Sequence, residues 1–246
     1  AAAKGVAVIE DCAQAHGAEH CGRPVGGLGQ VAAWSFCQDK IMSTGGEGGM
    51  VTTNDPDIHR RIWQLKDHGK NPDRVGQPRA THSFAYVHDA VGTNARLTGP
   101  QAAIGLVQLD RLPEWRAQRA RHATRLADRL DDIAGLRVHR PPAHLTHAWY
   151  KFYARLDLDR LKPGWTRDRV IDAIRAEGVP CFSGACPEIY REGAFDGLGV
   201  RPAAPFANAD RLGQDSIMLQ VHPTLSARDV EDMAEAVVKV VADACT

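Results

Sequence analysis

The sequence lacks long apolar runs and any excess of charge. No stretch approaches the ~18 consecutive apolar residues that a membrane-spanning helix needs. The 30 Lys and Arg residues balance 30 Asp and Glu residues, so the formal net charge is zero. Nothing in this balance points to nucleic acid or an anionic membrane as a partner. With 43% hydrophobic residues and no internal repeat, the composition is typical of a globular protein.

The sequence also lacks any C-x-x-C pair among its six cysteines. We therefore expect reduced thiols in a cytoplasmic protein rather than a disulfide framework. Cys181 and Cys186 lie close together, but no second Cys/His pair at zinc spacing accompanies them. The sequence thus predicts no metal site.

The first residues read as the end of a helix. Ala1 to Lys4 followed by Gly5 has the composition of a last helical turn with a glycine after it. An apolar strand follows at once, so we expect the sequence to begin inside a βα repeat, with an N-terminal portion preceding it.

The segment after Gly5 predicts several strands, the first of which is followed by two carboxylates. Apolar residues predict a buried parallel strand over 6–9, and further strands over 31–36 and 49–53. Glu10 and Asp11 follow the first strand, at the end where open α/β sheets bind ligands. A helix is predicted over 57–67, and the polar, Gly- and Pro-containing segment 69–93 predicts a long loop.

The second half of the chain predicts a helical connector and another domain. Thr98, Pro100 and Gln101 indicate a helix start, and Pro113 is expected to break or kink that helix before a second one over 114–133. Strands are predicted over 149–158 and 216–221, and helices after Thr166 and Ser226. We expect domains at 1–112 and 135–246, joined by a connecting helix at 113–134.

One lysine stands out. Lys40 follows an aromatic and apolar run and precedes a glycine-rich loop. A lysine in such surroundings is easily desolvated, and its neutral amine can attack a carbonyl group. The alternative is a strand end whose lysine extends to water.

Several motifs bear on whether Lys40 is reactive or only a lysine at a strand end, because together they occur in the order found in one known family. They are E-D-C-A-Q-A-H-G-A (10–18), S-F-C-Q-D-K (35–40), T-G-G-E-G-G-M (44–50), G-T-N-A-R-L-T (92–98), Q-A-A-I-G-L-V-Q-L (101–109) and V-H-P-T-L-S (221–226). Together they resemble the sugar aminotransferases of the DegT/DnrJ/StrS type, with perosamine synthases as the nearest picture. The resemblance implies the α/β fold type I of pyridoxal 5'-phosphate (PLP) enzymes. We expect part of a large domain, with a mostly parallel sheet, and a C-terminal α+β small domain.

The resemblance also implies roles for five residues. Lys40 would form the Schiff base with PLP and carry protons during the reaction. Asp11 would pair with the pyridine nitrogen and keep it protonated. Gln14 would bond the ring hydroxyl, on one helical turn with Asp11. Ser35 would donate to the cofactor phosphate, and Asn94 would reach the phosphate of a neighbouring subunit in a homodimer with shared active sites.

Other polar residues are left outside this set. Glu47 follows two glycines where the commoner family form has one, which leaves its role open, and Arg96 is weighed against a structural salt bridge. Histidines that could approach the substrate are His16, His82, His88 and His222. The family's N-terminal phosphate-binding turn and its ring-stacking aromatic residue do not occur in this sequence.

The function implied is transfer of an amino group from an amino acid, glutamate by expectation, to a keto group of a nucleotide-linked deoxysugar. Cyclitol ketones are acceptors of some relatives and stay open. One alternative is an aminotransferase-like regulatory or nucleic-acid-binding protein, motivated by Arg111, Arg116, Arg119, Arg121, Arg125 and Arg129. Acidic residues interrupt these arginines, which favours a solvated face. The other alternative is an inactive truncated remnant.

Overall fold

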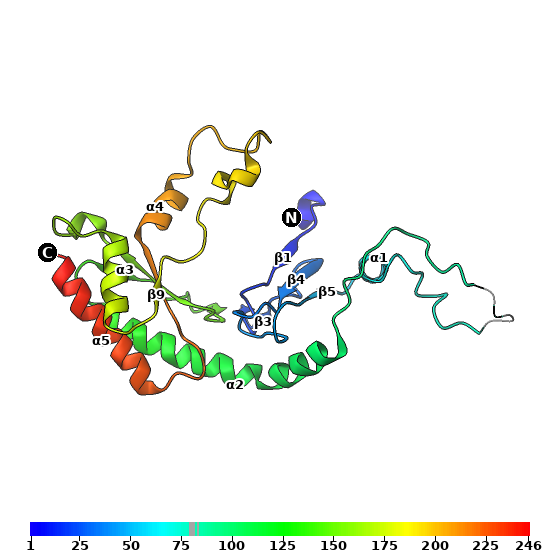
Figure 1. Cartoon of the computed structure of the whole chain (residues 1–246), viewed down its shortest axis with the longest axis horizontal. Helices are drawn as coiled ribbons and strands as arrows, with labels where there is room; N and C mark the ends of the chain where they lie inside the picture. Colours follow the sequence, from blue (N-terminus) through cyan, green and yellow to red (C-terminus); the bar gives the residue numbers. More distant parts are fainter. Residues whose placement is uncertain (79–81, 83) are drawn as a thin grey trace. The chain divides into compact units, whose positions relative to one another are not determined.

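The computed structural model describes residues 1–78, 82 and 84–246 (Figure 1). The chain divides into two compact units, one of residues 1–115 and 143–148, the other of residues 116–142 and 149–246. The division falls inside helix α2 (Gly99–Leu130), which contributes residues to both units. The domain ranges expected from the sequence, 1–112, 113–134 and 135–246, stay a prediction.

The first unit is built on a three-stranded sheet of order β1-β4-β5. Strand β1 (Ile9–Asp11) pairs in parallel with β4 (Val31–Ser35), and β4 pairs antiparallel with β5 (Gly49–Thr53). The strands predicted over 31–36 and 49–53 are confirmed. The mostly parallel arrangement that we expected holds only for the β1–β4 pair.

The first strand lies later in the chain than predicted. Val6 to Val8 are outside β1, although the sequence predicts a strand over 6–9. The reason is a partner distant in the chain, because the Val8 N–H donates to the Gln30 side chain at 2.6 Å and not to a strand backbone. Ile9 is 74% exposed, so the buried strand expected here is wrong for the described residues.

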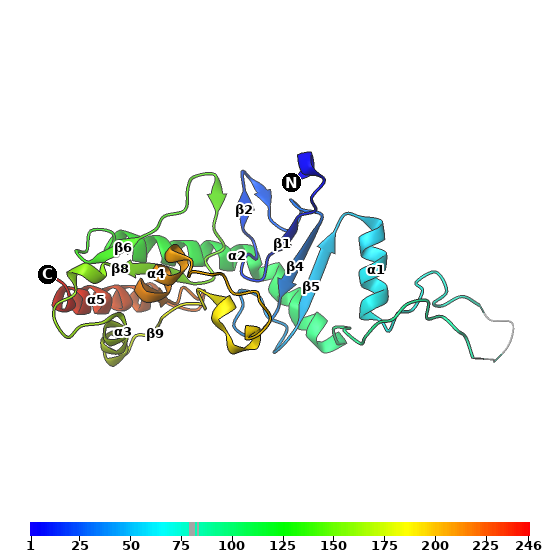
Figure 2. The ribbon, with the colours of Figure 1, turned by 90° about the horizontal axis from the view of Figure 1, so that it is seen from above.

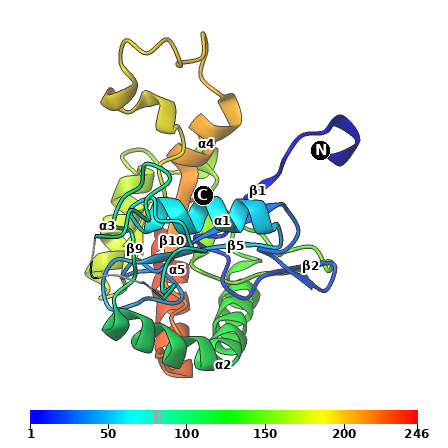
Figure 3. The same ribbon diagram turned by 90° about the vertical axis from the view of Figure 1, so that its right-hand side faces the viewer.

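Helix α1 (Pro56–Lys66) returns along the sheet. It begins at Asp55, whose carboxylate accepts from the backbone N–H groups of Asp57 and Ile58, and it confirms the helix predicted over 57–67. Five residues of strand and 11 of helix each span roughly 16 Å. The end of α1 therefore lies on the side where β5 begins (Figure 2). Figure 3 shows α1 and α2 on opposite faces of the sheet.

Shorter elements complete the first unit. A small sheet of order β3-β2-β7 combines β2 (Glu19–His20), β3 (Arg23–Pro24) and β7 (Leu145–Thr146). The chain starts with a 3-10 turn, Ala2–Lys4, and Gly5 after it has φ 63°. The predicted glycine-capped helical turn is thus confirmed.

Helix α2 does not break at Pro113, in contrast to the prediction of two separate helices. Pro113 lies inside a helix of 32 residues. Proline removes one hydrogen-bond donor, but buried residues hold the helix on either side of it. Gly105 is buried in the first unit, and Leu126 and Leu130 are buried in the second.

The second unit has a four-stranded antiparallel sheet of order β6-β8-β10-β9. Its strands are β6 (Leu136–Val138), β8 (Phe152–Leu156), β9 (Cys181–Phe182) and β10 (Ser216–Leu219). Its helices besides α2 are α3 (Arg167–Ala176), α4 (Ala207–Asp215) and α5 (Ala227–Ala244), with 3-10 turns at Leu158–Arg160, Ile189–Arg191 and Gly193–Phe195. The α+β character predicted for this region is confirmed.

The main hydrophobic core lies within the second unit. Phe152, Ile217 and Leu219 of the sheet are fully buried against apolar residues of α2, α3 and α5. The predicted helix caps are present. Thr166 accepts from Arg169 N–H, and Ser226 forms a capping box with Asp229. The β8 strand is shorter than predicted at both ends. Trp149 has φ 52° and does not belong to the extended chain, and a 3-10 turn begins at Leu158.

Candidate active site

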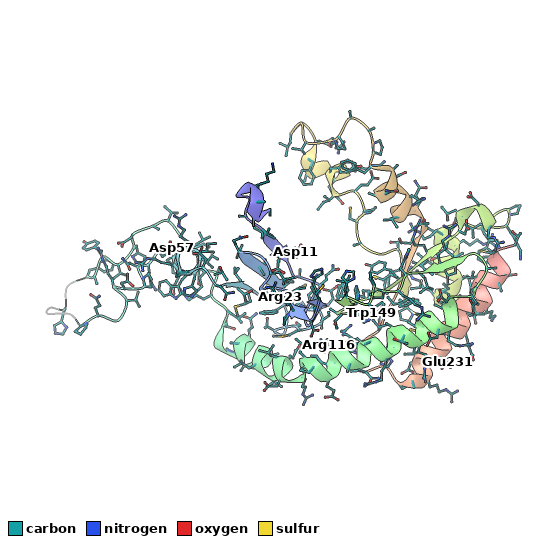
Figure 4. All side chains as sticks on the ribbon, turned by 180° about the vertical axis from the view of Figure 1, so that it is seen from behind. Asp11, Arg23, Asp57, Arg116, Trp149 and Glu231 are labelled. Atoms are coloured by element: carbon teal, nitrogen blue, oxygen red, sulfur yellow. The ribbon has the colours of Figure 1, made fainter. Side chains whose placement is uncertain are left out.

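The parallel pairing of β1 and β4 gathers predicted site residues at one sheet edge. Asp11, the last residue of β1, is level with Ala33, so Ser35 lies two residues further along at the end of β4. This register separates the Cα atoms of Asp11 and Ser35 by roughly 8 Å. Figure 4 shows Asp11 at the end of the β1 ribbon. Both residues therefore lie at the carboxyl edge of the same sheet, the edge where open α/β sheets bind ligands.

Glu10 and Asp11 make different contacts, although they are neighbours in the sequence. Successive strand residues point to opposite faces. Glu10 accepts backbone N–H groups from Gly26, Leu28 and Gly29 at 2.7–2.8 Å. Burial raises the pKa of Glu10, but these bonds and Arg23 outweigh it and lower that pKa overall. Glu10 thus fixes the glycine turn, whereas the Asp11 side chain takes no part in it.

Asp11 keeps most of its capacity to accept hydrogen bonds. Its Oδ1 accepts from Ala13 N–H at 3.0 Å, and the side chain is exposed. Gln14 is exposed too, in a turn closed by the bond from Ala15 N–H to Cys12 O at 3.0 Å. The helical turn expected to join Asp11 and Gln14 is absent from this segment, which forms a single tight turn instead.

Lys40 lies on the loop that leaves the end of β4. Phe36 N–H donates to Gly48 O at 2.8 Å and closes the base of this loop. Lys40 is half-buried, and its N–H donates to Cys37 O at 3.1 Å. The next two residues, Ile41 and Met42, are buried, so the backbone around Lys40 is held.

The glycine loop after Lys40 is closed by Glu47. The Glu47 carbonyl oxygen accepts from Thr44 Oγ1 at 3.3 Å and from Gln101 Nε2 at 2.7 Å. Its carboxylate accepts from the Cys37 thiol at 3.5 Å. Gly45 and Gly46 have φ 79° and 147°, which side chains rarely tolerate. The extra glycine thus serves a tight turn that points Glu47 back to Cys37.

Asn94 is held at the end of α1. It forms an isolated bridge with Asp67, and Thr93 N–H and Ala95 N–H donate to carbonyls of the last turn of α1. Asp67 is 9% exposed and binds Arg96 at 2.6 Å and Lys70 at 3.0 Å. Arg96 therefore makes the structural salt bridge that was weighed against a ligand role. The Asn94 side chain is exposed, and its Oδ1 accepts from Arg96 N–H at 3.5 Å.

The histidines fall into different settings. His16 is buried with its ring 5.3 Å from Trp34 and 5.9 Å from Phe36, beside an apolar cavity of about 400 Å³ in the first unit. His82 and His88 are exposed. His222 belongs to the second unit, where its Nδ1 lies 2.7 Å from Thr224 Oγ1. Desolvation, with Arg119 and Lys151 nearby, lowers the pKa of His222.

Three arginines of α2 form bonds within the protein. Arg119 is 3% exposed and donates to the carbonyls of Trp149 and Tyr150 at 3.2 Å. Burial lowers the pKa of Arg119 to about 10. Arg125 donates to Ala227 O, and Arg129 pairs with Glu231. Because these three arginines are bonded within the protein, they do not form a continuous stripe that could contact phosphates.

The cysteines and charged clusters of the described part of the chain form no metal centre. All six cysteines are free. Within residues 1–78, 82 and 84–246, no group of three or more His, Cys, Asp or Glu side chains could hold a metal ion. In the same residues, no helix is long and apolar enough to cross a membrane.

The fold and the sheet edge define the class of protein. An α/β unit with a lysine loop and an aspartate at the carboxyl edge, followed by an α+β unit, is the arrangement of PLP-dependent aminotransferases of fold type I, and comparison with solved structures confirms this fold. Residues 1–238 match the DegT/DnrJ/EryC1/StrS aminotransferase family. The chain belongs to this family, so the resemblance seen in the sequence is confirmed.

Three similar proteins illustrate the match. GDP-perosamine synthase of Caulobacter vibrioides is 36% identical over 93% of this chain and 57% of its own length. The erythromycin biosynthesis sensory transduction protein EryC1 of Saccharopolyspora erythraea is 32% identical over 96% of this chain and 58% of its own. An aminotransferase from Psychrobacter cryohalolentis, known from its X-ray structure, is 43% identical with a TM-score of 0.92 and covers 99% of this chain. This chain covers 64% of that one, so it spans less than two thirds of each of the three proteins.

Three structural residues of the site were not predicted from the sequence. Asp67 holds Arg96 beside Asn94, and Gln108 accepts from the backbone of the Lys40 loop. Glu10 was noted only as a second carboxylate. Its signal was present, since a carboxylate followed by a turn with three glycines (26, 27 and 29) supplies an acceptor and close N–H donors.

We predict that Gly69 is required to place the segment before Asn94. Gly69 and Gly76 have φ 79° and 81°, so alanine strains both by about 1–2 kcal/mol. Only at Gly69 would a Cβ overlap the Ala90 carbonyl oxygen, whereas no described atom lies within 4 Å at Gly76. Gly69→Ala should lower the free energy of unfolding in urea by about 3 kcal/mol or more, and Gly76→Ala by about 1 kcal/mol. Equal losses would contradict this explanation.

We also predict an acid-sensitive contribution from Asp67. The Lys70 ammonium, then Arg96, holds the pKa of Asp67 below its ordinary value. The carboxylate therefore stabilises the fold fully above the ordinary aspartate pKa of about 4 and loses that effect as pH falls through its lower folded value. The stability difference between wild type and Asp67→Asn should be constant above the ordinary aspartate pKa of about 4 and should shrink at lower pH. Unfolding experiments between neutral and acid pH measure this difference. Parallel curves would refute the prediction.

Proposed function

We propose that the protein is a PLP-dependent aminotransferase that moves an amino group from an amino acid, glutamate in our proposal, to a keto group of a nucleotide-linked deoxysugar. The observation that carries this proposal is the placement of Asp11 and Ser35 at one carboxyl edge, with the Lys40 loop leaving it, in a chain of this family. The printed activity of the perosamine synthase relative supports the sugar class.

The side chains present fit the cofactor in their chemistry. Ser35 Oγ accepts from Cys37 N–H at 3.3 Å, which leaves the hydroxyl hydrogen for a phosphate oxygen. Asp11 is an exposed carboxylate with one bond from Ala13 N–H, so it can still accept from a protonated pyridine nitrogen. Lys40 is the primary amine of the loop at this edge, and Gln14 lies on the turn after Asp11.

PLP, when bound, supplies an aromatic ring that accepts the electrons released at the amino donor's α-carbon. Asp11 would hold the proton on the ring nitrogen and so keep the ring electron-poor. Lys40 Nζ would attach the cofactor. Once the amino donor has displaced it, the free amine of Lys40 would carry the proton between the donor's α-carbon and the cofactor's C4′ carbon. Ser35 would orient the phosphate.

We further propose a cytoplasmic homodimer in which Asn94 serves a neighbouring subunit. The exposed Asn94 side chain, fixed through Asp67 and Arg96, supports a role beyond its own chain. Six free thiols agree with a reducing compartment. A purely regulatory role is less favoured, because arginines of α2 are bonded internally.

The first test is the visible spectrum of the natural protein that carries this sequence, purified with PLP. We expect an absorption band of lysine-bound cofactor that Lys40→Ala abolishes, and glutamate should convert the wild-type cofactor to its aminated form. Lys40→Arg is the matched control, since it keeps the positive charge but has no primary amine. A wild type without the band, or a band that survives in Lys40→Ala, would refute the proposal. A panel of nucleotide keto sugars and cyclitol ketones would then identify the acceptor.

The second test addresses the shared site. Lys40→Ala and Asn94→Ala proteins should each be inactive or weakly active alone. If Asn94 completes the neighbour's site, a mixed dimer has one site carrying both changes and one carrying neither. Mixing the two variants after mild dissociation should therefore restore part of the activity. No recovery in dimers shown by mass spectrometry to be mixed would place Asn94 in its own subunit's site.

A further inference from the structure

The loop that carries Lys40 is fastened to helix α2 at two points. Ser43 N–H donates to Gln108 Oε1 at 2.8 Å, and Gln101 Nε2 donates to Glu47 O at 2.7 Å. The two glutamines are seven residues apart, which is two helical turns, so they lie on the same face of α2. Both are half-buried.

Between the two glutamines, the same face of α2 carries a glycine. Gly105 follows Gln101 by four residues and is buried. A Cβ at this position would lie 3.1 Å from Thr44 Cγ2 and 3.7 Å from Met42 Cε, closer to Thr44 than most contacts allow. Glycine therefore lets the helix approach the loop closely enough for both glutamine side chains to bond its backbone.

The fastened segment is the one that sets where Lys40 lies. Ser43 and Glu47 lie shortly after Lys40 in the chain. In the same segment, Ile41, Met42 and Thr44 are buried. Before Lys40, the chain is fixed by the β4 strand and the turn from Cys37 to Lys40. The Lys40 backbone is thus held from both sides, and α2 supplies the second support.

We propose that Gln101 and Gln108 are positioning residues for Lys40, acting through hydrogen bonds to the backbone of its loop. This inference rests on the proposed function, because it assigns the glutamines a purpose in presenting the amine. The two amides work in opposite senses. Gln108 is used as an acceptor and Gln101 as a donor, and the backbone groups that they meet fix which end of each amide faces the loop.

Because Gln108 accepts and Gln101 donates, the same substitution should have different effects at the two positions. A role in packing alone does not predict this difference. In Gln108→Glu, a carboxylate oxygen can still accept from Ser43 N–H, so the bond is kept. In Gln101→Glu, the donor to Glu47 O is lost, while the acceptor bonds from Thr98 N–H and Oγ1 can remain. Gln→Met at each position preserves length and removes both kinds of bond.

Two readouts are needed on the natural protein. Hydrogen exchange of the loop amides needs no cofactor, and the rate at which borohydride fixes PLP on Lys40, measured by peptide mass over a range of pH, reports on the amine. Loss of one such hydrogen bond corresponds to about a three- to tenfold change. We expect that change in loop exchange and in PLP fixation for Gln101→Glu, Gln101→Met and Gln108→Met, and less than about twofold for Gln108→Glu.

The outcomes separate this inference from the proposed function. If Glu and Met variants behave alike at both positions, or if loop exchange changes without any change in PLP fixation, the positioning role is wrong. If the wild type fixes no PLP on Lys40 while exchange follows the expected pattern, the proposed function fails and the fastening of the loop stands. Thermal unfolding of each variant checks that the fold is intact.

Discussion

The pairing of β4 with both of its neighbours is the constraint on which the candidate site depends. Its parallel register with β1 puts Asp11 and Ser35 at one edge, and its antiparallel register with β5 brings Gly49 level with Ser35. The 13 residues between Ser35 and Gly49 must therefore turn back at that edge, and Lys40 lies among them. A one-residue slip of β4 would send Ser35 to the other face of the sheet.

Around this edge, several backbone groups are bonded by side chains outside the set of candidate site residues. Glu10 collects three N–H groups of the glycine turn, and Gln101 and Gln108 bond the Lys40 loop. In the segment before α2, Asp67 instead binds a side chain, that of Arg96. Loops cannot satisfy their own backbone as helices and strands do, so each loop that carries a site residue needs such a partner.

The second unit shows the contrast between a core and a site. Its main core is continuous over β8, β10, α3 and α5 and is almost wholly apolar. The first unit leaves Ile9, Val6 and Met50 exposed and an apolar cavity beside α2. The unit that carries the candidate site residues is thus the less fully packed of the two, and directed hydrogen bonds add to burial in holding its loops.

The family, the helix over 57–67 and the helix caps at Thr166 and Ser226 could be read from the sequence, because motifs and caps are short-range patterns. The roles of the candidate site residues stay predictions. The sequence reading misplaced the first strand, expected a break or kink at Pro113 with a second helix after it, and expected a helical turn at Gln14. It did not reveal what Asp67 and Gln108 bind. Those outcomes depend on partners distant in the chain, such as Gln30 for Val8 and Ser43 for Gln108. Tertiary structure decided them, because a hydrogen-bonding group chooses among all partners that folding brings near it, and sequence spacing specifies only the nearest ones.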